Sequence, residues 1–131
     1  MDTDHDVLLV DNYPAMTQML RSILRELGFK NIDQASNGLA ALAMIRSNSY
    51  RLVFSDLNME PMSGMQLLRE VRGDPKLKST RFIVISGSGT PEQVRDAKDP
   101  GATDYIVKPF TIETVRKKLA GMGLVLSGRG A

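Results

Sequence analysis

The feature that most constrains this chain is a set of three short apolar runs. They are Val7–Val10, Leu52–Phe54 and Phe82–Ile85, and each is followed directly by an aspartate or a serine. Short runs without polar alternation are typical of strands that are buried on both faces of a parallel sheet. A sheet of this kind needs a layer of helices on each face, so the segments between the runs are expected to be helical.

Apolar residues at helical spacing do occur between these runs. The first helix is expected to begin at Pro14, a residue favoured at the first helical position, and to stop at Gly28. The last helix should follow Thr111, whose side chain can cap it. Three more helices are expected between these two, around residues 39–45, 65–71 and 92–98.

Two further runs, Ile32–Ala35 and Tyr105–Val107, complete a predicted sheet of five strands. Strands one, three and four are the most apolar and should lie at the centre, which favours the strand order 2-1-3-4-5. The alternation of strands and helices predicts right-handed crossovers. The expected fold is therefore an α/β, doubly wound (flavodoxin-like) five-stranded parallel sheet with five helices on both faces.

The length of 131 residues suits one domain, which we expect to span residues 1–123, with a flexible glycine-rich tail at 124–131. The net charge is only +2 and no basic run is present, so we expect no nucleic-acid partner. The acidic start of the chain does not resemble a signal peptide, no apolar run is long enough to cross a bilayer, and cysteine is absent. These features predict a cytoplasmic protein with no membrane association.

The ends of the predicted strands carry an unusual set of polar side chains. Because all strands of a parallel sheet end at one edge, these side chains should face one crevice, where ligands of such folds bind. The set consists of two carboxylates, a carboxamide, a hydroxyl and an ammonium: Asp11, Asn12, Asp56, Ser86 and Lys108.

Such a set has a definite charge balance. Asp11 and Asp56 on adjacent strands would repel each other unless a cation lay between them. Lys108 supplies one positive charge, and Mg²⁺, which prefers oxygen ligands, could supply the rest. A carboxylate held beside a magnesium ion and a lysine is suited to attack phosphorus. The metal and the ammonium would neutralise charge on the phosphoryl oxygens, and Ser86 could donate a hydrogen bond to one of them.

With these residues at its strand ends, the chain resembles the receiver domain of two-component response regulators, in particular the stand-alone, chemotaxis-type (CheY-like) receivers. The resemblance runs from about Val7 to Met122, nearly the whole chain. It rests on several short motifs in the right order and at the right spacing rather than on a single decisive one. The matching segments are Val10-Asp11-Asn12, Ser55-Asp56-Leu57-Asn58-Met59, Ser63-Gly64, Ile85-Ser86-Gly87, Gly101-Ala102, Tyr105 and Lys108-Pro109-Phe110.

The resemblance implies a role for the acidic residues. Asp56 would accept a phosphoryl group from the phosphohistidine of a histidine kinase, or exchange it with a histidine phosphotransfer partner. Asp11 and Asn12 would occupy the family's acidic pair, which binds Mg²⁺ together with Asp56 and the backbone carbonyl of Asn58.

The resemblance also implies how such a protein switches. Lys108 would contact the phosphoryl group, Ser86 would be the switch hydroxyl, and Tyr105 would be the aromatic residue that changes rotamer with it. Asn58 and Ser88 match positions that tune hydrolysis of the aspartyl phosphate. The output would be a protein target bound by the face of the fourth helix, fifth strand and fifth helix. Such a protein is a signalling switch rather than an enzyme, since it catalyses only its own phosphorylation and dephosphorylation.

Asn12 departs from the family pattern, which usually has Asp or Glu at this position. An amide oxygen can still bind Mg²⁺, but one negative charge is missing. A unit charge at a distance of about 4 Å contributes up to about 4 kcal/mol near a protein surface. We therefore expect weaker magnesium binding than is usual for the family.

Three alternatives stay open from the residues alone. Asp11 and Asn12 could simply cap the first helix, because both residue types are preferred there. The chain could be a degenerate receiver that acts as a phosphate-independent protein-interaction module, which the amide at Asn12 supports. The third alternative is a flavin or nucleotide binder of the flavodoxin-like class. Asp11 speaks against it, because its negative charge would lie where the ligand's phosphate binds.

Overall fold

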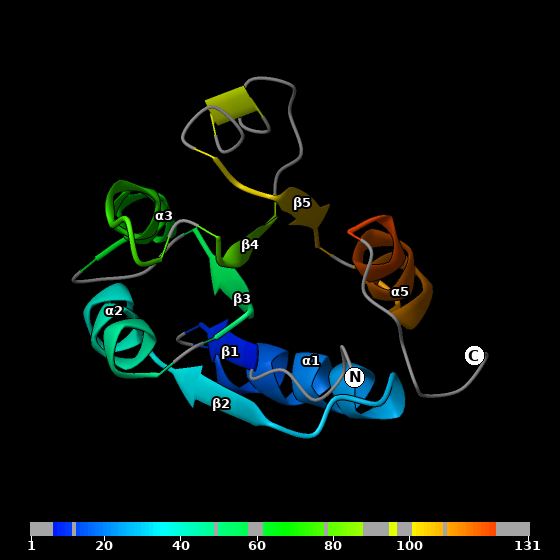
Figure 1. Cartoon of the computed structure of the whole chain (residues 1–131). Helices are drawn as coiled ribbons and strands as arrows, with labels where there is room; N and C mark the ends of the chain where they lie inside the picture. The colour runs from blue at the N-terminus through cyan, green and yellow to red at the C-terminus, as the bar shows by residue number, and fades with distance from the viewer. Residues whose placement is uncertain are drawn as a thin grey trace.

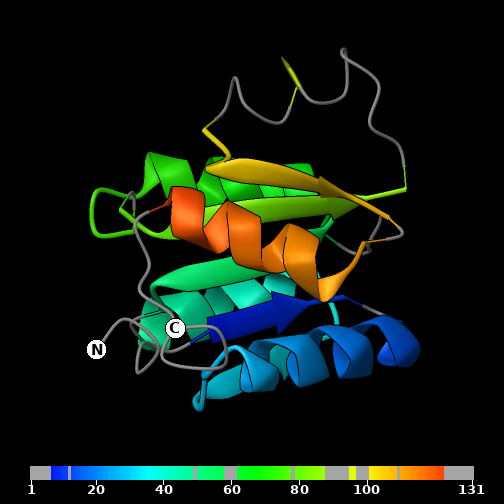
Figure 2. The same ribbon diagram turned by 90° about the vertical axis from the view of Figure 1, so that its right-hand side faces the viewer.

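Five parallel strands form a single sheet in the order β2-β1-β3-β4-β5, as the sequence predicts. The computed structural model describes residues 7–11, 13–48, 50–57, 62–77, 79–87, 95–96, 101–108 and 110–122, and the account below is confined to them. Every pair of neighbouring strands is parallel, and the strand arrows visible in Figure 2 point the same way. The strands are β1 (Val7–Val10), β2 (Ile32–Ala35), β3 (Leu52–Asp56), β4 (Arg81–Ser86) and β5 (Asp104–Val107).

Four helices cover the two faces of this sheet within the described residues: α1 (Pro14–Glu26), α2 (Gly38–Ser47), α3 (Gly64–Gly73) and α5 (Ile112–Gly121). Helices α1 and α5 lie on one face, and α2 and α3 lie on the other (Figure 1). Of the helix predicted around residues 92–98, only Arg95 and Asp96 are described, and both are helical and exposed. The predicted tail at 124–131 lies outside the described residues. None of the four helices is long and apolar enough to cross a membrane.

The central strands are buried on both faces because their side chains alternate between two apolar layers. Val7 and Leu9 of β1 pack toward α1 and α5, whereas Leu8 and Val10 pack toward α2 and α3. Every residue of β1 and β3 is buried, while β2 exposes its two middle residues, as expected for a strand at the edge. Unbroken apolar runs therefore identified the centre of the sheet correctly.

Local sequence signals set the helix ends. Pro14 occupies the first turn of α1, and Gly28 follows its last turn, as predicted. The side chain of Thr111 accepts a hydrogen bond from the backbone N–H of Thr114 and caps α5, also as predicted. Helix α3 starts with a capping box, in which Ser63 and Gln66 satisfy each other's backbone N–H groups.

Arg72 at the end of α3 fastens the segment that leads into β5. Its Nε donates a hydrogen bond to the carbonyl oxygen of Gly101 at 2.7 Å. Partial burial lowers the pKa of Arg72 below its ordinary value, but an arginine remains charged at neutral pH. Gly101 has φ of +112°, a conformation that residues with a Cβ rarely adopt.

We predict that Gly101→Ala destabilises the fold by about 1–2 kcal/mol, because the positive φ penalises a Cβ. The added Cβ would also lie 3.0 Å from the Arg72 side chain and disturb its hydrogen bond. Urea unfolding followed by circular dichroism measures the change. Gly121→Ala is the matched control, since an added Cβ there has no neighbour within 4 Å. Equal stability of the two variants would contradict this account of Gly101.

Candidate functional site

Asp56 and Lys108 form a close ion pair at the carboxyl edge of the sheet. Asp56 is the last residue of β3 and is only 7% exposed, and Lys108 directly follows β5. The Nζ atom of Lys108 lies 3.0 Å from Oδ1 of Asp56, although the two residues are 52 positions apart in the chain. The structure thus brings together the predicted nucleophile and the predicted cation.

Asp11 lies at the same edge, on the strand next to β3. The parallel register pairs Val10 with Ser55, so Asp11 and Asp56 are the next residues on two neighbouring strands. Asp11 is 8% exposed, and its Oδ1 accepts a hydrogen bond from the backbone N–H of Tyr13 at 2.8 Å. Tyr13, not Asp11, is the N-cap residue of α1, and its side chain makes no capping hydrogen bond; Asn12 lies outside the described residues. Asp11 therefore does not cap α1 in the way that the first alternative supposed.

Ser86 and Tyr105 are also buried near this edge. Ser86 is the last residue of β4, and its carbonyl oxygen accepts a hydrogen bond from the backbone N–H of Lys108 at 2.8 Å. Tyr105 of β5 belongs to the apolar layer that faces α2 and α3. Of the other predicted site residues, Asn12, Asn58 and Ser88 lie outside the described residues.

The donor set at this edge fits a hard divalent cation. Asp11 and Asp56 offer carboxylate oxygens, and Lys108 offsets one of their two negative charges. Mg²⁺ commonly binds through one or two carboxylates and keeps several waters. In the described part of the chain, no three histidine, cysteine, aspartate or glutamate side chains gather in a cluster that could hold a metal. Among the described residues, Asp11 and Asp56 are the two that could hold it.

Gly64 supports the site through its backbone, a role that the sequence reasoning did not assign to it. It opens α3 directly beside the end of β3, and its N–H donates to the carbonyl oxygen of Leu57 at 3.0 Å. A Cβ added at Gly64 would overlap the carbonyl oxygen of Asp56. That same oxygen accepts a hydrogen bond from the Ser55 hydroxyl at 2.9 Å. In the sequence, Gly64 appears only within the matching segment Ser63-Gly64, because a close approach between two backbones leaves no other trace in the sequence.

We predict that Gly64→Ala destabilises the protein by about 1–3 kcal/mol or more, because the overlap forces the backbone at Asp56 to move. Thermal unfolding measures the loss of stability, and the amide NMR shifts of Asp56 and Lys108 report the displacement. Gly87→Ala is the matched control at the same edge, since a Cβ there meets no atom within 4 Å. An unchanged melting temperature in Gly64→Ala would refute the close approach.

Comparison with known proteins decides the family. The family model of the response regulator receiver domain matches residues 7–120 of the chain. The chain belongs to this receiver family. The receiver is similar to the chemotaxis protein CheY-3 of Vibrio cholerae, with 38% identity over 86% of this chain and 87% of that protein.

Solved structures agree with this assignment. The chemotaxis response regulator CheY4 of Vibrio cholerae has a TM-score of 0.83 and 31% identity, over 90% of this chain and 98% of that one. The receiver domain of the sensor histidine kinase PA1611 from Pseudomonas aeruginosa has a TM-score of 0.80, over 92% and 98% of the two chains. Its structure has a magnesium ion coordinated in the active site cleft, but its 21% identity shows a common fold alone.

Membership of the family has two consequences. Receiver domains are phosphorylation switches, so the prediction of a signalling switch rather than an enzyme is confirmed. A two-component receiver also implies a histidine kinase as partner. The alternative of a flavin or nucleotide binder loses its support.

Proposed function

We propose that Asp56 is the phosphoacceptor of this receiver. The observation that carries the proposal is the 3.0 Å contact between the buried Asp56 carboxylate and the Lys108 ammonium. A carboxylate oxygen of Asp56 attacks the phosphorus of a phosphohistidine on the partner kinase or phosphotransfer protein. The new O–P bond forms as the P–N bond breaks, and the electron pair of the broken P–N bond goes to the imidazole nitrogen. Lys108 neutralises charge on the phosphoryl oxygens.

Magnesium completes this proposal. Asp11, Asn12, Asp56 and the backbone carbonyl of Asn58 would hold the ion, which neutralises charge on the phosphoryl oxygens when bound. The hydrogen bond from the backbone N–H of Tyr13 holds the Asp11 carboxylate in place just before the start of α1, which supports this role. The side chains of Asn58 and Ser88 would set how fast the aspartyl phosphate hydrolyses.

The switch that we propose runs from Ser86 to Tyr105 and then to α5. Ser86 moves toward the phosphoryl group, and Tyr105 follows as the aromatic switch. The neighbour of Tyr105 supports this route, because Asp104 forms an ion pair with Lys118 of α5 at 3.0 Å. A shift of β5 therefore reaches α5 directly. The target protein would bind the face made by the predicted fourth helix, β5 and α5.

The pathway that we propose is chemotaxis in the cytoplasm. Its support is the similarity, over most of this chain, to proteins named for chemotaxis in Vibrio cholerae and Pseudomonas aeruginosa. The cognate donor would be a histidine kinase, and the output would be a protein contact.

We predict that acetyl phosphate labels the protein in a Mg²⁺-dependent manner and that Asp56→Ala abolishes the labelling, because the variant lacks the attacking oxygen. Phosphate-affinity electrophoresis measures the phosphorylated fraction. Asp96→Ala, which removes an exposed aspartate, should be labelled like the parent protein. Labelling that persists in Asp56→Ala would contradict the assignment of Asp56 as the phosphoacceptor.

We predict that Asn12→Asp tightens Mg²⁺ binding by about tenfold or more, because it restores a negative charge close to the ion. Isothermal titration with Mg²⁺ measures the dissociation constant of each variant. Asn48→Asp is the matched control, since it adds the same charge at an exposed position after α2. Equal gains in both variants would rule out Asn12 as a metal ligand.

The amide at Asn12 also favours a second candidate, a phosphate-independent interaction module with the same fold. Beryllofluoride, a mimic of the phosphoryl group, distinguishes the two functions. With Mg²⁺ present, a switch shows heat of binding and shifted NMR signals at Ser86 and Tyr105. A module with an idle pocket shows neither.

A further inference from the structure

The start of α2 lies against the segment that leads from β3 into α3. Helices α2 and α3 lie side by side on one face of the sheet (Figure 1). Gly38, the first residue of α2, is buried, and a Cβ added to it would lie 2.5 Å from the backbone carbonyl oxygen of Met62. The same Cβ would lie 2.7 Å and 2.8 Å from the Cβ and Cγ atoms of Met62. The approach of Met62 therefore leaves no room for a side chain at position 38.

No other feature of α2 requires a glycine at this position. Gly38 does not have a positive φ, so its backbone conformation is open to any residue. Glycine is also a poor helix former, and helix propensity alone favours an alanine here. The close approach to Met62 is therefore the structural reason for the glycine.

The segment that contains Met62 makes a second close approach on its other side. A Cβ added at Gly64 would overlap the carbonyl oxygen of Asp56, and the N–H of Gly64 donates to the carbonyl oxygen of Leu57. Ser63, between the two contacts, is held by the capping box of α3. Residues 62–64 are thus packed between the start of α2 and the end of β3. Because close-packed interiors have low compressibility and transmit strain, a displacement of Met62 reaches Asp56.

The start of α2 is itself fixed in place. The side chain of Asn37 accepts a hydrogen bond from the backbone N–H of Ala40 at 2.8 Å and caps the helix. Just before this turn, the carbonyl oxygen of Ala35 accepts a hydrogen bond from the backbone N–H of Asp11 at 3.1 Å. The turn between β2 and α2 therefore gives residues 62–64 a firm support that is tied to the same edge of the sheet.

We propose that Gly38 is a positioning residue of the phosphoacceptor site, which fixes the backbone at Asp56 through Met62 and Gly64. The inference rests on the proposed function of Asp56. Gly38 has no side chain that could reach an ion or a phosphoryl group, so it acts only through its neighbours. Mg²⁺ demands near-ideal octahedral geometry, and changes in the residues that support its ligands lower metal affinity by about 10- to 100-fold.

The variant Gly38→Ala tests the proposal on the full chain. In metal-free protein, ¹⁵N NMR should show shifted amide signals at Leu57 and Gly64, which reports the displacement without any bound ligand. Isothermal titration should show Mg²⁺ binding weakened by about tenfold. Labelling by acetyl phosphate, followed by phosphate-affinity electrophoresis, should be slower at each Mg²⁺ concentration.

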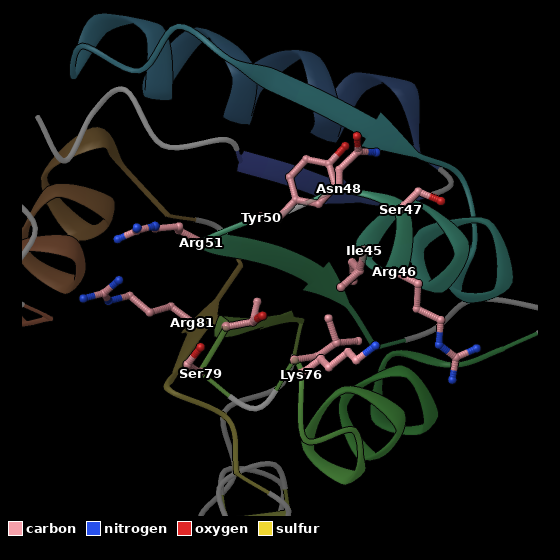
Figure 3. A pocket seen from close by; sticks show the side chains of 11 residues that line it. Ile45, Arg46, Ser47, Asn48, Tyr50, Arg51, Lys76, Ser79 and Arg81 are labelled. Carbon is pink, nitrogen blue, oxygen red and sulfur yellow. The ribbon is translucent and has the colours of Figure 1, made fainter.

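Two variants of the same helix are matched controls. Leu39→Ala changes the next residue, which is exposed. Ser47→Ala changes the last residue of α2, which lines a pocket at the opposite edge of the sheet, where β3 and β4 begin (Figure 3). Both variants should bind Mg²⁺ like the parent protein.

A general loss of stability has its own control in Gly101→Ala, which strains the backbone before β5 and should leave the Mg²⁺ affinity unchanged. Melting temperatures show that each variant is folded. Adding Met62→Gly to Gly38→Ala removes two of the three close contacts and should restore part of the lost affinity. This double variant, compared with Met62→Gly alone, decides the question if Gly38→Ala does not fold.

Several results would overturn the inference. One is a raised melting temperature of Gly38→Ala with unchanged Mg²⁺ affinity, which would mean that helix propensity outweighs the contact with Met62. Another is an equal loss of affinity in Gly101→Ala, which would indicate an effect of stability alone. A parent protein that neither binds Mg²⁺ nor is labelled would refute the proposed function of Asp56 and the inference with it. Parent protein that is labelled, with Gly38→Ala labelled equally fast, would refute the inference only.

Discussion

The contact between Asp56 and Lys108 is the interaction on which the candidate site depends. Taken separately, a buried carboxylate is costly, and its cost is offset when a cation and hydrogen-bond donors lie close to it. The side chains of Asp56 and Lys108 are only 10% and 22% exposed, so water screens their charges less than at an open surface. A phosphoryl group and a magnesium ion would enter a site in which Lys108 attracts the Asp56 carboxylate and Asp11 repels it.

The parallel sheet is what places these charges together. Hydrogen bonds between β1 and β3 put Asp11 beside Asp56, and the backbone bond from Lys108 to Ser86 ties the end of β5 to the end of β4. Gly64 allows α3 to start against the carbonyl of Asp56 without a steric clash.

The sequence predicted those parts of the structure that depend on local pattern. Unbroken apolar runs identified β1, β3 and β4, and residues at the strand ends identified Asp11, Asp56, Ser86 and Lys108 as neighbours. It could not predict the close approach at Gly64, which depends on how two backbones meet.

Chemical trapping of the phosphorylated residue tests the central claim most directly. Borohydride reduces an aspartyl phosphate to homoserine, and mass spectrometry of the digested protein then locates the modified position. After phosphorylation by acetyl phosphate with Mg²⁺, our account predicts homoserine at position 56. Homoserine at position 11 or at any other aspartate, with none at 56, would contradict it.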